Sequence, residues 1–302
     1  MENSHKWGIE LAPLLVYNKH VKDHCVFLLD MLLNQLSKNY TADKISLVRD
    51  HCVFLLDKLL IFLKGINMLE IKNICFEVEG RKILDDISLD VADGKVVCLT
   101  GPNGGGKTTL AKMIAGVELP TSGHIYLDGK DIAALNPTER AKLGVSYAFQ
   151  QPVRFKGITV RDMLEMAKGY KLSDEECKAA LENVGLNAEA YIDRPIDAKL
   201  SGGEIKRIEI AGVLLRDSKL VVFDEPEAGI DLWSFNNLIR VFEELRESRK
   251  CSIIIISHQE RILKIADEIV MIQSGKLGLR GDKNKIFPSL LCDKDCDNCS
   301  IC

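Results

Sequence analysis

The sequence lacks any long, uncharged apolar run of the kind that crosses a membrane. A spanning helix needs about 18–20 consecutive apolar residues. The most apolar N-terminal stretch, Cys52 to Leu63, is shorter and contains Asp57 and Lys58. The N-terminus also lacks the basic start and small-residue cleavage site of a secretory signal. These absences predict a cytoplasmic protein with no direct membrane insertion.

An excess of positive charge is missing as well. The 302 residues include 40 Lys and Arg against 44 Asp and Glu, which gives a net charge of −4. There is therefore no overall basic field to attract nucleic acid. The length allows one large or two modest domains, and the 46% hydrophobic content is ordinary for a soluble globular protein. We expect a globular chain whose main partner is not a nucleic acid.

A glycine-rich loop stands between a strand-like run, Val96 to Leu99, and a helix-like run, Leu110 to Ala115. The loop matches the pattern G-x-x-x-x-G-K-[ST] without a mismatch. Its glycines let the backbone approach an anion, and the N–H groups of the loop and helix start point at phosphate oxygens. A glycine-rich turn before a structural helix is the alternative. The pattern predicts a phosphate site made of Gly101, Pro102, Asn103, Gly104, Gly105, Gly106, Lys107, Thr108 and Thr109.

Within this loop, Lys107 is expected to reach the β- and γ-phosphates, and the Thr108 hydroxyl to ligate Mg²⁺. A second apolar run, Leu220 to Phe223, ends in the carboxylates Asp224 and Glu225. That order is typical of the second half of a phosphate-loop ATPase. Asp224 would hold Mg²⁺ through its water shell, and Glu225 would orient and polarise the attacking water. The alternative is a strand that ends in surface acids.

The segment Leu200 to Glu204 combines a capping box, formed by Ser201 and Glu204, with two glycines that expose backbone N–H groups. With this segment the chain resembles the ATP-binding cassette (ABC) ATPase family. The resemblance implies an α/β phosphate-loop NTPase fold with a mixed sheet core and an inserted helical subdomain. It also implies that Ser201, Gly202 and Gly203 bind the γ-phosphate of ATP held by a second copy. An ATP-dependent homodimer with two sandwiched ATP molecules is the implied assembly.

Further roles are implied by the same resemblance. Gln150 stands where the family places a glutamine that senses Mg²⁺ and the γ-phosphate, with Gln151 as an adjacent competitor. Asp231 closes a loop that contacts the opposite subunit in the family. His258 stands where the family has a histidine on the γ-phosphate. The expected catalytic residues are thus Glu225, His258, Lys107 and Gln150.

One departure from the family concerns the adenine base. Most members stack the adenine on an aromatic residue late in the first strand, where Val78 stands here, with Phe76 two residues earlier. Contacts to the base are therefore weakly specified.

Three runs, at residues 147–152, 200–207 and 223–231, are similar to those of SufC-type ATPases, as is the missing aromatic. The last run, with residues 232–235, looks most like the compact archaeal and clostridial form. This resemblance implies an ATPase that drives iron–sulfur cluster assembly on a SufB/SufD-like scaffold. The alternative is the ATPase subunit of a membrane ABC transporter, docked through the same helical insert. A non-enzymatic, metal-binding role for the chain ends is a third hypothesis.

Three regions are expected along the chain. Residues 1–67 contain near copies, Lys22–Leu33 and Arg49–Leu60, which differ only at the first and tenth positions. Their helical spacing predicts an N-terminal helical extension, unless the native chain begins at Met68 and the segment is a start-site artefact. Residues 68–287 are expected to form the ATPase domain, with the helical subdomain at about 150–212, and residues 288–302 a cysteine-rich tail.

That tail holds four of the ten cysteines, namely Cys292, Cys296, Cys299 and Cys302. In a cytosolic protein such a cluster indicates metal or redox chemistry before disulfides. The four thiolates could bind one Zn²⁺ ion or an iron–sulfur cluster. A redox-labile tail and a tail without function are the alternatives.

Overall fold

The computed structural model describes residues 67–152, 155, 157–197 and 199–288. The chain divides into one unit over Met1–Gly65 and another over Ile66–Cys302. All the described residues belong to the second unit. The expected helical repeat and the cysteine tail therefore lie outside the described residues.

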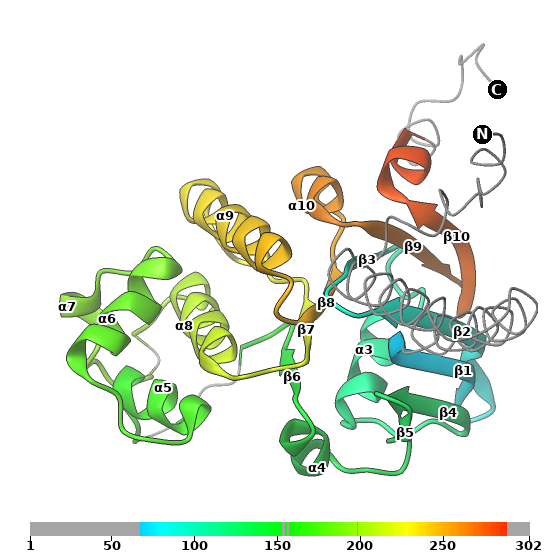
Figure 1. Ribbon diagram of the computed structural model, residues 1–302, viewed down its shortest axis with the longest axis horizontal. Coiled ribbons are helices and arrows are strands. Elements are labelled where there is room, and N and C mark those ends of the chain that lie inside the picture. The colour runs from blue at the N-terminus through cyan, green and yellow to red at the C-terminus, as the bar shows by residue number, and fades with distance from the viewer. Residues whose placement is uncertain (1–66, 153–154, 156, 198, 289–302) are drawn as a thin grey trace, which may run out of the picture. The chain divides into compact units, whose positions relative to one another are not determined.

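A six-stranded sheet forms the centre of this unit (Figure 1), with the strand order β10-β9-β3-β8-β7-β6. All its pairs are parallel except β9 with β10. Every residue of β3, β7 and β8 is buried, as expected for parallel strands covered on both faces. The strands are β3 (Val96–Thr100), β6 (Val145–Ala148), β7 (Leu220–Asp224), β8 (Ser252–Ile256), β9 (Glu268–Gln273) and β10 (Lys276–Asp282).

A four-stranded antiparallel sheet has the order β2-β1-β4-β5. Its strands are β1 (Asn67–Val78), β2 (Arg81–Ala92), β4 (Ser122–Leu127) and β5 (Lys130–Asp131). Helix α3 (Lys107–Ala115) contacts β2 of this sheet and β7 of the larger one. Apolar residues of both sheets and of α3 share one buried cluster, which includes Leu69, Met113 and Val222. The helix that follows the phosphate loop is thus fixed between the two sheets.

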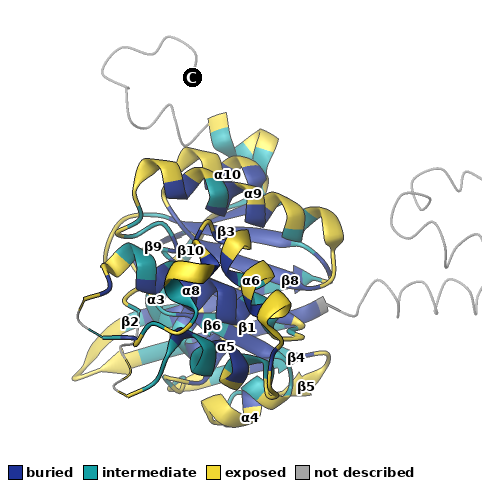
Figure 2. Cartoon of the chain, turned by 90° about the vertical axis from the view of Figure 1, so that its left-hand side faces the viewer, coloured by how far each residue is buried: buried dark blue, intermediate teal, exposed yellow. Residues whose placement is uncertain are grey.

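Four helices are inserted between β6 and β7: α5 (Val160–Lys168), α6 (Asp174–Asn183), α7 (Ala188–Tyr191) and α8 (Gly202–Leu215). Thr159, Ser173 and Ser201 each cap a helix through a complete capping box. Leu164, Leu181 and Ile208 of the insert join the other face of the large sheet in a second buried cluster. Figure 2 shows this burial along the strands, with exposed residues on the outer helix faces. The expected architecture, a mixed α/β sheet core with a helical insert, is confirmed.

The remaining helices are α4 (Pro137–Lys142), α9 (Leu232–Ser248) and α10 (Glu260–Ile265), and residues 283–288 are also helical. Helix α9 begins at the side chain of Asp231, which accepts hydrogen bonds from the backbone N–H groups of Trp233 and Ser234. In the part of the chain that the structure describes, no helix is long and apolar enough to cross a membrane.

Candidate active site

The phosphate loop, Gly101 to Thr109, lies against β9. Gly101 has φ 125°, and a Cβ there would come within 2.2 Å of the carbonyl oxygen of Ile272. Gly106 precedes α3, and no side chain caps that helix. The N–H groups of its first turn thus face the loop without a side-chain acceptor, the arrangement that binds phosphate at helix starts. The loop fits the triphosphate of ATP on this ground.

Lys107 is buried inside the loop that it closes. Its Nζ donates to the carbonyl oxygens of Gly101, at 2.7 Å, and Pro102, at 3.0 Å. Burial lowers the pKa of Lys107, whereas the charges of Glu225 and Asp224 act in the opposite direction. The ammonium group is therefore held by the loop's own carbonyls, close to two acids.

Asp224 ends β7 and is fully buried. The Thr108 hydroxyl donates to its Oδ1 at 3.1 Å, and the Tyr147 hydroxyl donates to its Oδ2 at 2.8 Å. Burial raises the pKa of Asp224, and these two hydrogen bonds lower it. A hydroxyl beside a carboxylate is the kind of oxygen set that Mg²⁺ prefers. The residues expected to hold Mg²⁺ therefore fit that ion, and Tyr147 orients one of them.

Glu225 follows with φ 45°, a left-handed conformation that is rare outside glycine. Its N–H donates to the carbonyl of Ile256 at 3.0 Å, and Gln150 Nε2 donates to its Oε2 at 2.7 Å. The structure thus brings Gln150 to the carboxylate expected to polarise water. Strained backbone of this kind clusters at functional sites.

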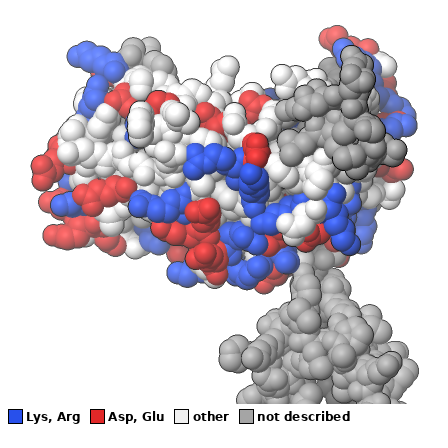
Figure 3. Space-filling view, turned by 90° about the horizontal axis from the view of Figure 1, so that it is seen from above, with Lys and Arg blue, Asp and Glu red and all other residues white. Residues whose placement is uncertain are grey.

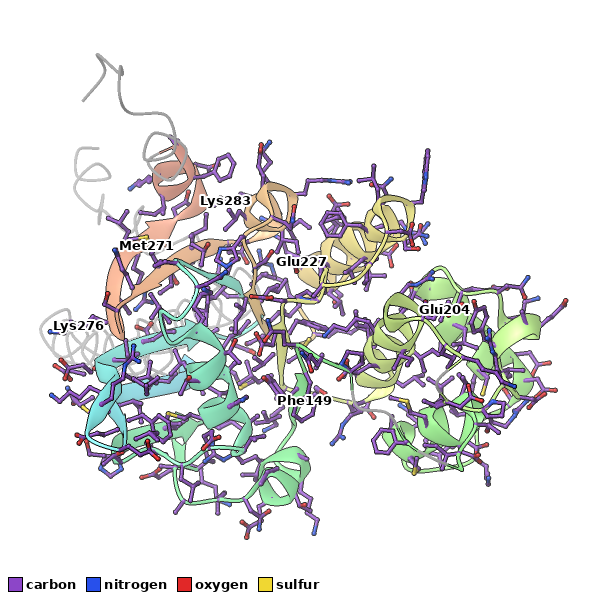
Figure 4. All side chains as sticks on the ribbon, turned by 180° about the vertical axis from the view of Figure 1, so that it is seen from behind. Phe149, Glu204, Glu227, Met271, Lys276 and Lys283 are labelled. Atoms are coloured by element: carbon purple, nitrogen blue, oxygen red, sulfur yellow. The ribbon has the colours of Figure 1, made fainter. Side chains whose placement is uncertain are left out.

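A buried ion pair on α8 holds the backbone next to Gln150. Lys206 is 0% exposed, donates to the carbonyl oxygens of Phe149 and Gln150, and lies 3.6 Å from Glu209. Glu209 accepts the Phe149 N–H at 2.9 Å. Burial lowers the pKa of Lys206 and raises that of Glu209. Figure 4 shows Phe149 between the strands and the helical insert. Through these two side chains, helix α8 holds the backbone that follows β6 in place.

His258 follows β8, which pairs in parallel with β7, so both strands end at one edge of the sheet. Its side chain is exposed. The preceding Ser257 donates from its hydroxyl to Glu227 at 2.5 Å. That bond ties the turn before His258 to the loop after Glu225.

The second predicted anion site is the start of α8. Ser201 Oγ accepts from the Glu204 N–H at 3.2 Å, and the Ser201 N–H donates to Glu204 at 2.6 Å. Tyr191 also donates to Glu204. Ser201 and Gly202 are exposed, and Figure 1 shows α8 well apart from α3. One copy of the chain therefore does not bring its two predicted phosphate sites together.

Sequence reasoning missed Tyr147, Lys206 and Glu209 as site residues. An available signal for the latter two was a lysine and a glutamate three residues apart on α8, a spacing that places both on one face of the helix. Val78, in place of an adenine-stacking aromatic, is 45% exposed.

No group of three or more His, Cys, Asp or Glu that could hold a metal ion occurs among the residues that the structure describes. The four tail cysteines lie outside them.

On the face shown in Figure 3, Lys and Arg are interspersed with Asp and Glu, so that face carries both signs of charge.

Comparison with known proteins identifies the family. The ABC transporter family model matches residues 84–228. An uncharacterized ABC transporter ATP-binding protein of Methanocaldococcus jannaschii is 37% identical over 243 residues, or 78% of this chain and 96% of the relative. A lipopolysaccharide export system ATP-binding protein of Acidithiobacillus ferridurans is 35% identical over 224 residues, 72% and 92% of the two chains.

Among solved structures, an ATP-binding cassette of an ABC transporter in its ADP conformation aligns with a TM-score of 0.64 and 28% identity. The alignment covers 76% of this chain and 96% of the solved chain. The chain belongs to the ABC transporter ATPase family. It is an enzyme that hydrolyses ATP. The two relatives carry transporter names, so the narrower SufC-type resemblance stays a prediction.

Proposed function

We propose that ATP binding closes two copies of this chain and that hydrolysis lets them part. The observation that carries this proposal is the separation of the two phosphate sites within one copy. Each ATP would join Lys107 and His258 of one copy to Ser201, Gly202 and Gly203 of the other. Asp231 would lie in the same contact between copies. The energy of hydrolysis would thus be read out as motion.

In this proposal Glu225 positions the attacking water and polarises it. Gln150 orients the Glu225 carboxylate, because its Nε2 donates a hydrogen bond of 2.7 Å to Oε2. Thr108 and Asp224 would hold Mg²⁺, which neutralises charge on the phosphate oxygens when bound. Lys107 would exchange its two loop carbonyls for the β- and γ-phosphates.

The test of the mechanism is Glu225→Gln. We expect it to keep ATP binding, to lower hydrolysis at least about 100-fold, as for loss of a general base, and to accumulate as a dimer with ATP in sedimentation. Glu243→Gln, which makes the same change at an exposed glutamate on α9, is the matched control and should turn over normally. Wild-type turnover in Glu225→Gln would refute the assignment.

The helical insert would pass the motion to a partner. Phe155 before α5, Met166 on it and Tyr170 just after it are 42%, 60% and 53% exposed. Exposed apolar side chains of this size are typical of contact surfaces. Lys206 ties the same insert to the backbone of Gln150. A partner docked on the insert could therefore sense the state of the site.

For the partner, we favour a membrane transport protein, with this chain acting at its cytoplasmic side, because the relatives carry transporter names. The second candidate is a SufB/SufD-like scaffold for iron–sulfur cluster assembly. It is favoured by two of the runs that resemble SufC-type ATPases, residues 147–152 and 200–207, which the Lys206 contacts join in one network.

Purification of the tagged chain from its native cells separates the two candidates. A polytopic membrane protein in the eluate supports transport, and a soluble, β-rich protein supports the scaffold. Met166→Asp and Tyr170→Asp should release either partner, because they place charge in the proposed contact. Leu279→Asp, on β10, is the control and should retain it.

A further inference from the structure

Leu232 and Trp233 are 70% and 80% exposed, the highest values among the large apolar side chains described. They form the first turn of α9, directly after Asp231. The Asp231 carboxylate accepts the N–H of Trp233 at 3.0 Å and that of Ser234 at 3.0 Å. The opposite face of α9 is buried through Phe235, Leu238 and Phe242. The pair is therefore presented outward on a helix start of fixed orientation.

This apolar pair lies beside the start of α8. A Cβ placed on Gly203 would meet the carbonyl oxygen of Gly229 at 2.7 Å, so the loop that leads into Asp231 packs on the segment Ser201 to Gly203. Helix α9 also lies against the insert, since a Cβ on Gly185 would meet Asn237 at 2.4 Å. Leu232 and Trp233 thus extend the surface that carries the second phosphate site.

We propose that Leu232 and Trp233 become buried against a second copy of this chain when ATP closes the dimer. This inference rests on the proposed function. It adds an apolar contact to the interface between copies, where the other proposed contacts are made through the phosphates of ATP. We expect a second copy to cover the pair because Leu232 and Trp233 adjoin Asp231 and Gly203, and both of these lie in the proposed contact between copies. A tryptophan buries about 150–250 Å² and is a frequent hot spot of interfaces.

The chain offers its own reporter for this contact, because Trp7 and Trp233 are its two tryptophans. In a Trp7→Phe, Glu225→Gln chain, emission comes from Trp233 alone. Addition of ATP and Mg²⁺ should shift that emission to the blue, and the shift should rise with protein concentration in step with the dimer seen by sedimentation. ADP, which lacks the γ-phosphate, should leave the emission unchanged.

Substitution gives the energetic half of the test. Trp233→Ser and, separately, Leu232→Ala in the Glu225→Gln background should each weaken the ATP-driven dimer at least tenfold, with ATP affinity of the single copy unchanged. Leu279→Ala removes a side chain that is 41% exposed on β10 and should leave the dimer constant unchanged.

The outcomes are distinct. If Glu225→Gln remains a single copy with bound ATP, the proposed function itself fails, and this inference with it. If the dimer forms while Trp233 emission and the dimer constant of Trp233→Ser stay unchanged, only this inference is overturned. A shift that appears only on addition of a different partner protein would overturn it equally.

Discussion

At the scale of single residues, Glu227 is a carboxylate with one satisfied and one unsatisfied oxygen. Ser257 donates to Oε1, whereas Oε2 is buried and has no hydrogen-bond partner. Burial raises the pKa of Glu227, and the Ser257 hydrogen bond only partly opposes it. The native state therefore holds this proton at pH values where the unfolded state, with a pKa of about 4.3, has released it. Stability contributed by Glu227 must fall as pH rises above that value.

Glu227→Gln should remove this fall while it keeps the shape of the side chain. As the pH rises above about 4.3, the variant should gain free energy of unfolding relative to wild type, because an ionised buried carboxylate is no longer formed. Urea unfolding at several pH values measures the difference. The exposed Glu243→Gln serves as control and should stay within about 0.5 kcal/mol of wild type throughout. A gain of the same size in both variants would contradict the explanation.

The sequence predicts the site residues whose roles depend on local pattern. Lys107, Thr108, Asp224 and Glu225 could be placed because a glycine-rich loop and an apolar strand ending in acids are readable from neighbouring positions. Tyr147 could not, since its partner Asp224 lies 77 positions away, and only the parallel pairing of β6 with β7 brings the two together.

At the scale of elements, a buried arginine stabilises the end of α3. The guanidinium of Arg140 is 0% exposed and donates to the carbonyls of Met113 and Ile114 on α3 and of Ala133 and Leu135 on the connection to α4. Burial lowers the pKa of Arg140 to about 10. One side chain thus satisfies carbonyls that the helix leaves open at its end.

Arg140→Met should lower the free energy of unfolding by at least about 2 kcal/mol, because several buried carbonyls lose their donor. Arg140→Lys should not restore it, since an ammonium group cannot reproduce the planar fork. Arg240→Met makes the same substitution at an exposed position of α9 and is the control. Urea unfolding decides, and a loss within the ordinary range of surface changes, about ±0.5 kcal/mol, would contradict the role.

The link between α8 and β6 is tested by a double-mutant cycle on Lys206 and Glu209. Lys206→Met leaves a buried carboxylate without its cation and should cost about 3–5 kcal/mol. The double variant Lys206→Met, Glu209→Leu should be more stable than Lys206→Met alone, because the unpaired charge is gone. Urea unfolding of the four chains gives the coupling energy. Additive losses would show that the two side chains do not act as a pair.

Elements differ in how well the sequence predicts them. The strands β3, β7 and β8 follow from their continuous apolar runs, and α5, α6 and α8 begin at recognisable capping residues. The edge strand β10 is largely exposed and, among the described strands, pairs with β9 alone, so it has no strong hydrophobic pattern. From the sequence, Asp231 is predicted only to lie in the contact between copies, through the family resemblance. The structure shows that its carboxylate also caps α9.

At the scale of the whole molecule, the proposed site is shared between two copies, and that can be tested by mixing. Lys107→Ala removes the phosphate cation, and Ser201→Arg blocks the start of α8, so each variant alone should be inactive. A mixed dimer contains one intact site, made of Lys107 from one copy and Ser201 from the other. Mixing should therefore restore ATP hydrolysis to a measurable fraction of wild type.

A mixture that stays as inactive as its components would contradict the shared site, provided that each variant folds by circular dichroism. The division of the chain at residues 67 and 288 stays a prediction. The order of sheet, helical insert and sheet was predictable because it depends on periodicity, whereas the register between distant strands was not.

The Lys107 contacts have a consequence for the speed of nucleotide capture. Since the ammonium group already rests on Gly101 and Pro102, the loop keeps its curved shape through its own bonds. Binding then requires an exchange of partners for one side chain, and this preorganisation lowers the entropy cost of ordering the loop. The loop is thus a preformed receptor, and nucleotide capture need not wait for it to fold.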